Sequence, residues 1–411
     1  MREPLSPRAK VLVASMIGMT VSFSAVGPAT FSLFVLPLSH AFGWGRGDIS
    51  VALTLKSLAA AGLAPFAGLL ADRFGPRRIL LPAIALFAGL TTGLGLLDGR
   101  ILGFYALYLL ISVAGLGASS LIYSRVVVGW FESRRGLALG AVLCGIGAGV
   151  AVLPLFVRAM IAAEGWRTAY AALGAVIAAI SLPLAAAWIR DPPAPRDPAP
   201  AFRTRIARRP FLLLALTFVL LGACSEGMLG HLAPLLSDRG MPAGRAAAVA
   251  SSLGLALIGG RLLTGYLMDR FFAPVVAAAF LSLQVAGLGL LFAHPGPSLL
   301  LAATLMFGLS LGAEMDILGY LVSRYFPMPE FGRVYGLLFG AMSLGLAIGP
   351  VAMGYGHQLT GSYDAPLGLL LAAAALAIPP LLFLGPYADA APPSVSAALA
   401  GAPRPAHDAR P

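Results

Sequence analysis

Six ionisable side chains fall inside stretches of the sequence that are otherwise apolar. They are Lys56, Arg125, Glu226, Arg261, Glu314 and Asp316. An ionisable group inside a membrane-spanning helix costs about 2.5–3.5 kcal/mol on insertion scales, and it is retained where it faces a partner or a water-filled cavity. These six residues are therefore the first candidates for binding or for proton transfer.

Arg261 lies in the middle of the apolar stretch SLGLALIGGRLLTGYLMDRF, residues 252–271. It precedes Asp269 by eight residues, or about 12 Å of helix, which is too far for its charge to reach water comfortably. A guanidinium group can donate two parallel hydrogen bonds to a carboxylate. Arg261 is thus either a positively charged residue that binds an anionic substrate or one member of a structural ion pair with an acidic neighbour.

Three carboxyl groups are candidates for proton coupling: Glu226, Glu314 and Asp316. Glu314 is expected at the same depth as Arg261. Residues two apart on a helix point about 200° apart, so we expect one of Glu314 and Asp316 to face the cavity or Arg261 and the other to pack in the bundle. Burial disfavours a charged carboxylate, so each can carry a proton. A purely structural role is the alternative for all three.

Lys56 lies about two turns from the end of its apolar stretch. Its long stem can carry the ammonium group outward to water, and this interpretation is favoured over a role in an electropositive entry for anions. Other polar or aromatic side chains predicted to line a central cavity are Thr20, Ser22, Ser24, Thr30, Phe31, Tyr123 and Tyr320.

The composition explains where these residues must lie. Of 411 residues, 59% are hydrophobic and 11% are charged, and the mean hydropathy is +0.88, whereas soluble domains have about 25% charged residues. The net charge of +11 comes mainly from loop residues, which argues against nucleic-acid binding. Cys144 and Cys224 lie in apolar stretches and suggest neither a disulfide nor a metal site.

Apolar stretches of about 20 residues can cross a bilayer as helices, and we predict twelve. They cover residues 11–38, 49–71, 79–98, 101–130, 137–162, 168–189, 211–236, 246–268, 273–293, 298–322, 334–355 and 366–386. With the N-terminus inside, 19 loop cations fall inside and 6 outside, so both termini are expected to be cytoplasmic.

The chain divides into two similar parts. GLLADRF at 68–74 matches GYLMDRF at 265–271, and GWRTAY at 165 falls against GSYDAP at 361. We predict an all-α membrane protein with two pseudo-symmetric six-helix halves, 1–189 and 211–388, which is an architecture of transporters. A Pro- and Arg-rich cytoplasmic linker, 190–210, joins them, and the tail 389–411 is expected to be disordered.

Several loops resemble signatures of the major facilitator superfamily. GLLADRFGPRR (68–78) is close to its loop 2–3 signature and has a weaker copy in MDRFFAP. WFESRRGLALGAVLCG (130–145), FGWGRGDIS (42–50) and RYFPMPEFGRVYGLLFG (324–340) resemble the monocarboxylate transporter family and its bacterial oxalate–formate exchanger relatives.

This resemblance implies roles for particular residues. Arg261 falls where the family keeps an arginine that binds the substrate carboxylate, although Leu257 replaces the aspartate that vertebrate members carry one turn earlier. Asp72 is expected to pair with Arg125 as a conformational latch. The other residues assigned to this gating region are Arg73, Gly75 and Asp269.

We therefore expect a transporter of a small organic anion, foremost a monocarboxylate, by proton symport or carboxylate exchange with alternating access. The alternatives are a drug or metabolite exporter of the same fold and a non-transporting membrane receptor. No cofactor or metal is expected, the proton is the possible coupling ion, and no enzymatic site is visible. The protein is expected to act as a monomer in the lipid bilayer of a bacterial inner membrane.

Overall fold

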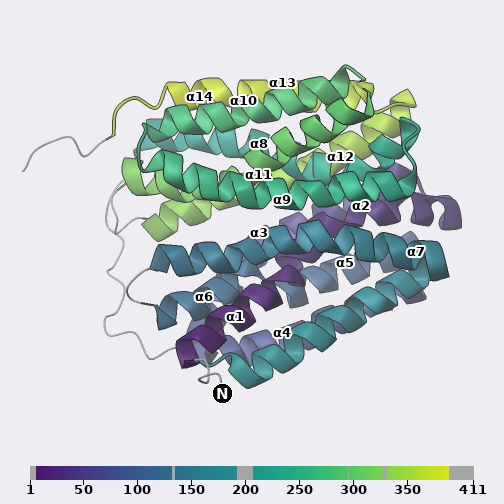
Figure 1. Cartoon of the computed structure of the whole chain (residues 1–411), viewed down its shortest axis with the longest axis horizontal. Helices are drawn as coiled ribbons and strands as arrows, with labels where there is room; N and C mark the ends of the chain where they lie inside the picture. Colours follow the sequence, from purple (N-terminus) through teal and green to yellow (C-terminus); the bar gives the residue numbers. More distant parts are fainter. Residues whose placement is uncertain (1–5, 132–134, 192–206, 295, 327–330, 388–411) are drawn as a thin grey trace, which may run out of the picture.

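The protein was analysed as a computed structural model that describes residues 6–131, 135–191, 207–294, 296–326 and 331–387. These residues form helices and connecting segments, and the described part contains no β-strand. The helices run along the long axis of the molecule and form two layers, one made by the first half of the chain and one by the second (Figure 1).

The first half begins with two helices that share the first predicted span. Its elements are α1 (Pro7–Thr20), α2 (Phe23–Phe42), α3 (Arg46–Phe74), α4 (Pro76–Gly93), the 3-10 turn η1 (Leu94–Leu96), α5 (Ile101–Leu116), α6 (Ser120–Trp130) and α7 (Arg135–Trp188).

The second half follows the same plan with fewer interruptions. Its elements are α8 (Arg208–Asp238), α9 (Ala243–Met268), α10 (Ala273–Phe292), α11 (Pro297–Tyr325), α12 (Phe331–Thr360), α13 (Asp364–Leu376) and α14 (Ile378–Leu382).

The lengths and compositions of these helices agree with twelve spans. Ten stretches of the described residues are long and apolar enough to cross a membrane. One of them, Ala138–Trp188, has 51 residues, and its helix is broken at Gly165, where φ is 85°. At 1.5 Å per residue this stretch is long enough for two crossings. Counting it twice and adding the 29-residue α3 gives the twelve predicted spans.

Two spans of the first half are not single helices, which the sequence did not predict. The first span breaks between α1 and α2, and the fourth breaks between α5 and α6. The breaks contact each other: the Phe23 amide donates to the Ala118 carbonyl at 3.2 Å, and the Ser120 amide donates to the Ser24 hydroxyl at 3.0 Å. These bonds satisfy backbone groups that a broken helix would otherwise leave unpaired in the membrane.

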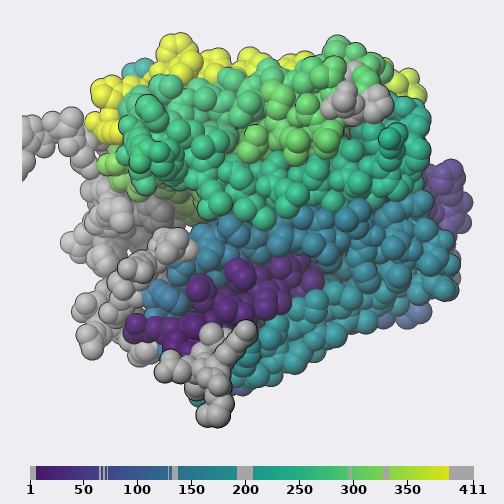
Figure 2. Space-filling model, in the orientation of Figure 1, coloured from purple at the N-terminus to yellow at the C-terminus, as the bar shows by residue number. Residues whose placement is uncertain are grey.

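The helices expose many apolar side chains, and Figure 2 shows one face of the bundle in space-filling form. Large hydrophobic side chains are exposed along the helices, among them Phe66 (60%), Leu102 (76%) and Leu262 (62%). In water such a surface would drive aggregation, whereas lipid solvates it. The chain is therefore an integral, multi-pass membrane protein.

Glycines let particular helices approach each other closely. A Cβ atom on Gly349 of α12 would overlap backbone atoms of Ala223 on α8, and one on Gly260 of α9 would overlap the backbone of Leu309 on α11. Small residues at such contacts are typical of helix packing in membranes. In this way α9 and α11, and likewise α8 and α12, become tightly joined pairs.

The two halves meet along a few helices. α3 packs against α12, α7 packs against α9, and α2 packs against α8. In Figure 1, α7 runs next to α9 where the two layers meet. Residues 192–206 of the expected linker and 389–411 of the expected tail lie outside the described residues, so the proposed domain boundaries stay predictions.

The glycine contacts generate a stability prediction. Gly349→Ala should lower the thermal unfolding temperature of the purified protein in detergent, because the added methyl group meets backbone atoms that cannot turn away, and overpacking costs about 1–3 kcal/mol. Gly340→Ala on the same helix is the control, since a Cβ there meets nothing within 4 Å and alanine favours the helix. Equal unfolding temperatures for both variants would contradict this account of α8–α12 packing.

Candidate functional site

Arg261 and Asp316 form an ion pair inside the second half. Arg261 extends from α9 and Asp316 from α11, with 3.5 Å between Nε and Oδ2. The two helices are held close by Gly260 and Gly312, where an added Cβ would overlap the backbone of the opposite helix. The carboxylate predicted to face Arg261 is thus Asp316.

This pair leaves hydrogen-bonding capacity unused. Arg261 is 8% exposed, and its Nε and Nη1 atoms have no hydrogen-bond partner among the described residues, nor has Oδ2 of Asp316. Cys144 of α7 and Tyr335 of α12 lie within Coulombic range of both charges. Because α7 belongs to the first half, the pair lies close to the interface between the halves.

Unsatisfied donors of this kind define what the site can bind. A buried guanidinium whose N–H groups lack acceptors carries a desolvation cost that an anionic ligand removes. Its planar fork suits a carboxylate, and a contact of 3.5 Å to Asp316 is too long for a good competing hydrogen bond. The geometry therefore allows a small carboxylate to occupy donors that Asp316 leaves open.

Lys56 does not reach outward, so the favoured sequence interpretation was wrong. Its ammonium group lies 2.6 Å from Oε1 of Glu226 on α8, and the two side chains are 11% and 8% exposed. Lys56 also lies beside the first turns of α2, with Nζ 5.9 Å from the Phe23 ring centre. A buried carboxylate on the facing half attracts the lysine more strongly than distant water does.

Glu314 lies beside this second pair and is not the partner of Arg261. Oε1 of Glu314 accepts a short hydrogen bond from the Ser225 hydroxyl of α8, and Glu314 lies within Coulombic range of Glu226. Of the two carboxyl groups on α11, Glu314 is therefore not the one that faces Arg261. The reason is helical phase: Glu314 and Asp316 point to different sides of α11, one toward α8 and the other toward α9.

Three other predicted cavity residues are engaged elsewhere in this conformation. Phe31 packs edge-on against Tyr108 in the first half, and Tyr123 is 1% exposed and contacts Gly18 of α1. The hydroxyl group of Tyr320 accepts a hydrogen bond from Arg324 at 3.0 Å. The structure pairs Arg261 with Asp316 and Lys56 with Glu226, with Glu314 close to Glu226. It does not bring these aromatic residues to either pair.

The gating residues lie at the other end of α3 from Arg46. Gly75 has φ of 88° and connects α3 directly to α4, and the Arg77 amide donates to Asp191 at 2.8 Å. The side chain of Asp72 lies outside the described residues, so its pairing with Arg125 stays a prediction. Arg73 packs on the Phe74 ring, and Asp269 caps the end of α9.

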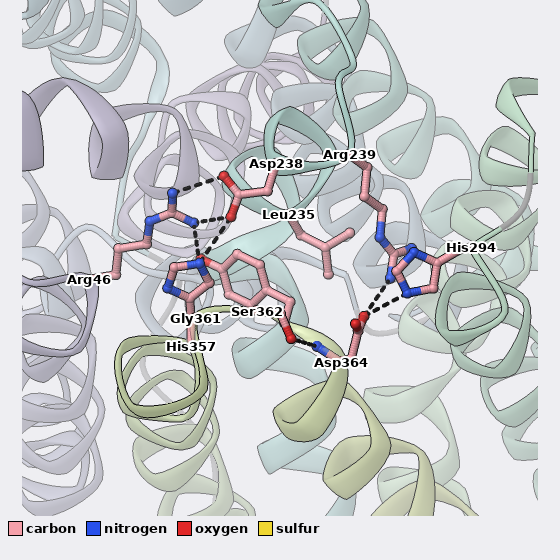
Figure 3. A pocket seen from close by; sticks show the side chains of 10 residues that line it. Arg46, Leu235, Asp238, Arg239, His294, His357, Gly361, Ser362 and Asp364 are labelled. Atoms are coloured by element: carbon pink, nitrogen blue, oxygen red, sulfur yellow. Dashed lines mark hydrogen bonds and ion pairs between the residues drawn. The ribbon is translucent and has the colours of Figure 1, made fainter.

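At the Arg46 end, ion pairs and hydrogen bonds join the two halves. Arg46 donates to both carboxylate oxygens of Asp238, at 2.5 and 2.9 Å. His357 of α12 lies 3.2 Å from Arg46 and 3.1 Å from Asp238. Tyr355 donates to Asp48 at 2.9 Å. Figure 3 shows Arg46, Asp238 and His357 converging from three helices.

His231 of α8 is fully buried and forms a further contact between the two halves, through Ser50 of α3. Tyr363 lies between α12 and α13, and burial raises its pKa to about 12, so its hydroxyl donates to Nδ1 of His231. Nε2 of His231 then carries the proton and lies 2.8 Å from the Ser50 hydroxyl and 3.1 Å from the Pro350 carbonyl. This tautomer is inferred from the hydrogen bonds.

A cavity of about 460 Å³ opens beside these residues (Figure 3). Its far side is formed by Asp364, which lies 2.8 Å from His294 and 3.6 Å from Arg239. The cavity is lined almost wholly by the second half, with Arg46 as the contribution of the first. It is separate from the central pairs and belongs to the Arg46 end of the bundle.

These contacts define the conformation. α3 is bound to the second half at Arg46, Asp48, Ser50, Thr54 and Lys56. The Arg46 end of the bundle is therefore closed. Neither Arg46 nor Asp238 was singled out as a functional residue from the sequence. No local pattern could have paired residues 192 positions apart.

Comparison with known proteins agrees with this architecture. Residues 11–312 match the family model of the Major Facilitator Superfamily, so the chain belongs to this superfamily. It is a membrane transporter and not an enzyme.

Individual relatives are more distant. The chain is 32% identical over 255 residues to human monocarboxylate transporter 11, a match that covers 57% of this chain and 53% of that protein. It is 31% identical over 163 residues to the oxalate:formate antiporter of Oxalobacter formigenes, covering 40% and 38% of the two chains. The solved nucleoside transporter NupG has a TM-score of 0.76 at 11% identity, with 92% and 100% of the chains covered, and this shows the fold alone.

The closed Arg46 end predicts the effect of removing one charge. Asp238→Asn should raise the rate at which a maleimide labels a cysteine placed at Leu53, which is 2% exposed and lies against Gly230 of the other half. The expected increase is several-fold, because the bond between Arg46 and a carboxylate is charge-assisted but partly exposed. The measurement uses purified protein with Cys144 and Cys224 replaced by alanine.

A matched control comes from the same end of the bundle. Asp98 pairs with Arg100 at 3.4 Å, but both side chains are largely exposed and belong to the same half. Asp98→Asn should leave the labelling rate of the Leu53→Cys protein unchanged. A rate that rises equally in both variants would mean that surface charge, and not the Arg46–Asp238 bond, controls opening.

Proposed function

We propose that the protein is a secondary transporter of small organic anions, foremost monocarboxylates, which it moves with a proton or in exchange for another carboxylate. The observation that carries this proposal is Arg261, buried between α9 and α11, whose Nε and Nη1 atoms have no hydrogen-bond partner among the described residues. The names of two relatives, a monocarboxylate transporter and an oxalate:formate antiporter, support the same class of substrate.

The Arg261–Asp316 pair favours a substrate with a single negative charge at this site. A carboxylate that binds Arg261 has Asp316 as a neighbour, and Asp316 repels a second negative charge placed close to it. A substrate with one carboxylate at this position avoids that repulsion. Asp316 also tethers the guanidinium group when the site is empty, which limits the cost of a buried lone charge.

Transport follows from alternating access, in which the two halves rock about the central site. The described conformation, closed at the Arg46 end, is one state of this cycle. With the orientation expected from the loop cations, the Arg46 end faces outward and both termini lie inside. We infer the inner membrane of a bacterium as the location and a monomer as the functional unit.

The two alternatives differ in their ligand or in their cycle. An exporter of amphiphilic cations would place a positive ligand beside Arg261, which the unpartnered guanidinium opposes. A receptor would bind a carboxylate without moving it. Counterflow of a labelled carboxylate into liposomes separates a transporter from a receptor, and a parallel assay with a labelled lipophilic cation tests the exporter.

The decisive variant is Arg261→Lys. We expect it to remain folded and to lose about tenfold or more of the counterflow of labelled lactate, formate or oxalate, whichever the wild type carries. A lysine keeps the charge but cannot form the bidentate contact, and a hydrogen bond to a charged group is worth about 1.5–3 kcal/mol.

Arg245→Lys is the matched control, because Arg245 lies exposed near the start of the same helix. It should transport like the wild type. Wild-type counterflow in folded Arg261→Lys protein would overturn the substrate assignment.

A further inference from the structure

A second cluster of buried charges joins the two halves beside the Arg261–Asp316 pair. Lys56 of α3, Glu226 of α8 and Glu314 of α11 are 9%, 6% and 1% exposed. Lys56 and Glu226 are in contact at 2.6 Å, Glu314 lies within Coulombic range of Glu226, and Ser225 donates to Glu314. The cluster thus contains one cation and two carboxyl groups.

Counting charges shows that this cluster must hold a proton. If all three groups were ionised, a net charge of −1 would remain on side chains that are at most 9% exposed, which is strongly unfavourable. Lys56 directly neutralises Glu226. The remaining proton is therefore on Glu314, whose hydrogen bond with Ser225 persists because a protonated carboxyl group still accepts.

The cluster is also divided by the movement that transport requires. Lys56 moves with the first half, whereas Glu226, Ser225 and Glu314 move with the second. When the Arg46 end opens, α3 withdraws from α8 and Lys56 loses contact with Glu226. The carboxyl pair then has no cation between or beside its members.

We propose that Glu226 and Glu314 form a proton-binding site whose occupancy is set by Lys56, so that opening of the Arg46 end binds one proton and closing releases it. This inference rests on the proposed alternating access and names the residues of the proton site. It does not depend on which carboxylate is carried.

The proton balance of the cycle is simple. In the open state Glu226 and Glu314 each carry a proton, and Lys56 is charged and faces water. On closing, the Glu226 carboxyl group gives its proton to water and its carboxylate pairs with the Lys56 ammonium group. Because the Arg46 end is then sealed, the proton leaves toward the Gly75 end. One proton crosses per cycle, and Lys56 keeps its own proton throughout.

The other titratable groups near the site have partners of their own, so they do not take over proton binding from Glu226 and Glu314. The Cys224 thiol of α8 lies within Coulombic range of Glu314, but it donates to the Leu370 carbonyl at 3.3 Å. His231, five residues along α8, is held by Tyr363, Ser50 and Pro350. The Arg261–Asp316 pair on α9 and α11 carries no net charge. At the Arg46 end, His357 is the group whose titration must be separated from that of Glu226.

The test measures opening of the Arg46 end without any substrate. Spin labels at Arg100→Cys and Arg245→Cys, both exposed and on different halves, report the distance between the outermost parts of the two halves by double electron–electron resonance. The protein is in lipid, with Cys144 and Cys224 replaced by alanine. In the wild type the ratio of open to closed molecules should rise as the pH falls, by up to about tenfold per pH unit, the limit for one linked proton.

Four variants test which residue causes the pH dependence of the ratio of open to closed molecules. Glu226→Gln mimics the protonated residue, so it should favour the open state and remove most of the pH dependence. Should it fold poorly, the Lys56→Met/Glu226→Gln double variant removes both charges and should be equally insensitive to pH. Thr54→Val loses a neutral bond from α3 to the Ala347 carbonyl, so it should shift the ratio but keep the pH dependence. His357→Gln should also keep it.

The outcomes separate this inference from the proposed function. A wild type insensitive to pH, or a dependence that persists in Glu226→Gln and vanishes in His357→Gln, overturns the proton site. Conversely, the expected pattern in a protein that carries no labelled carboxylate supports the proton site and overturns only the anion substrate. In liposomes, Glu226→Gln should retain lactate exchange but lose accumulation driven by a pH gradient, if lactate is carried.

Discussion

The structure depends on one constraint: a charge inside the membrane must be compensated within the protein, because no water is there to solvate it. The chain meets this constraint at two central places, with Arg261 against Asp316 and Lys56 against Glu226. The two pairs differ in a way that matters. The Arg261–Asp316 pair lies within one half, with 3.5 Å between Nε and Oδ2, and it leaves N–H donors of Arg261 unpartnered among the described residues. The Lys56–Glu226 pair joins the two halves, with 2.6 Å between Nζ and Oε1.

In the proposed transport cycle, this difference gives the two pairs separate roles. A pair within one half survives the rocking of the halves, so it can offer the same ligand site to either side of the membrane. A pair between halves must break in every cycle, so its charges report the conformation. Glu314 connects the two regions through α11, which also carries Asp316. Ligand and proton can thus be bound close together without competing for one residue.

Backbone features place these charges. Gly260 and Gly312 bring α9 and α11 close enough for Arg261 and Asp316 to meet. The breaks of the first and fourth spans contact each other through backbone bonds, and the first turns of α2 after this break lie against the Lys56 ammonium group. α3 then carries Lys56, Thr54, Ser50 and Arg46 to successive contacts with the second half.

The sequence by itself determined the class of the protein. Twelve apolar stretches, the repeated loop signature after Gly68 and Gly265, and a buried arginine at 261 predict the fold and the superfamily, because hydrophobic length and glycine-marked turns are local properties of the chain. The identity of the ionisable residues inside the membrane was equally visible, since a charge among apolar residues stands out in any window.

Only the tertiary structure decided which of these residues meet. The rotation of α11 about its axis decides that Asp316, and not Glu314, faces Arg261. The two carboxyl groups are only two residues apart in the sequence, but they point to different neighbouring helices. That Lys56 turns inward depends on Glu226, 170 residues away on the other half. Contacts of this kind follow from how helices pack and which end of the bundle is closed, and neither leaves a periodic signal in the chain.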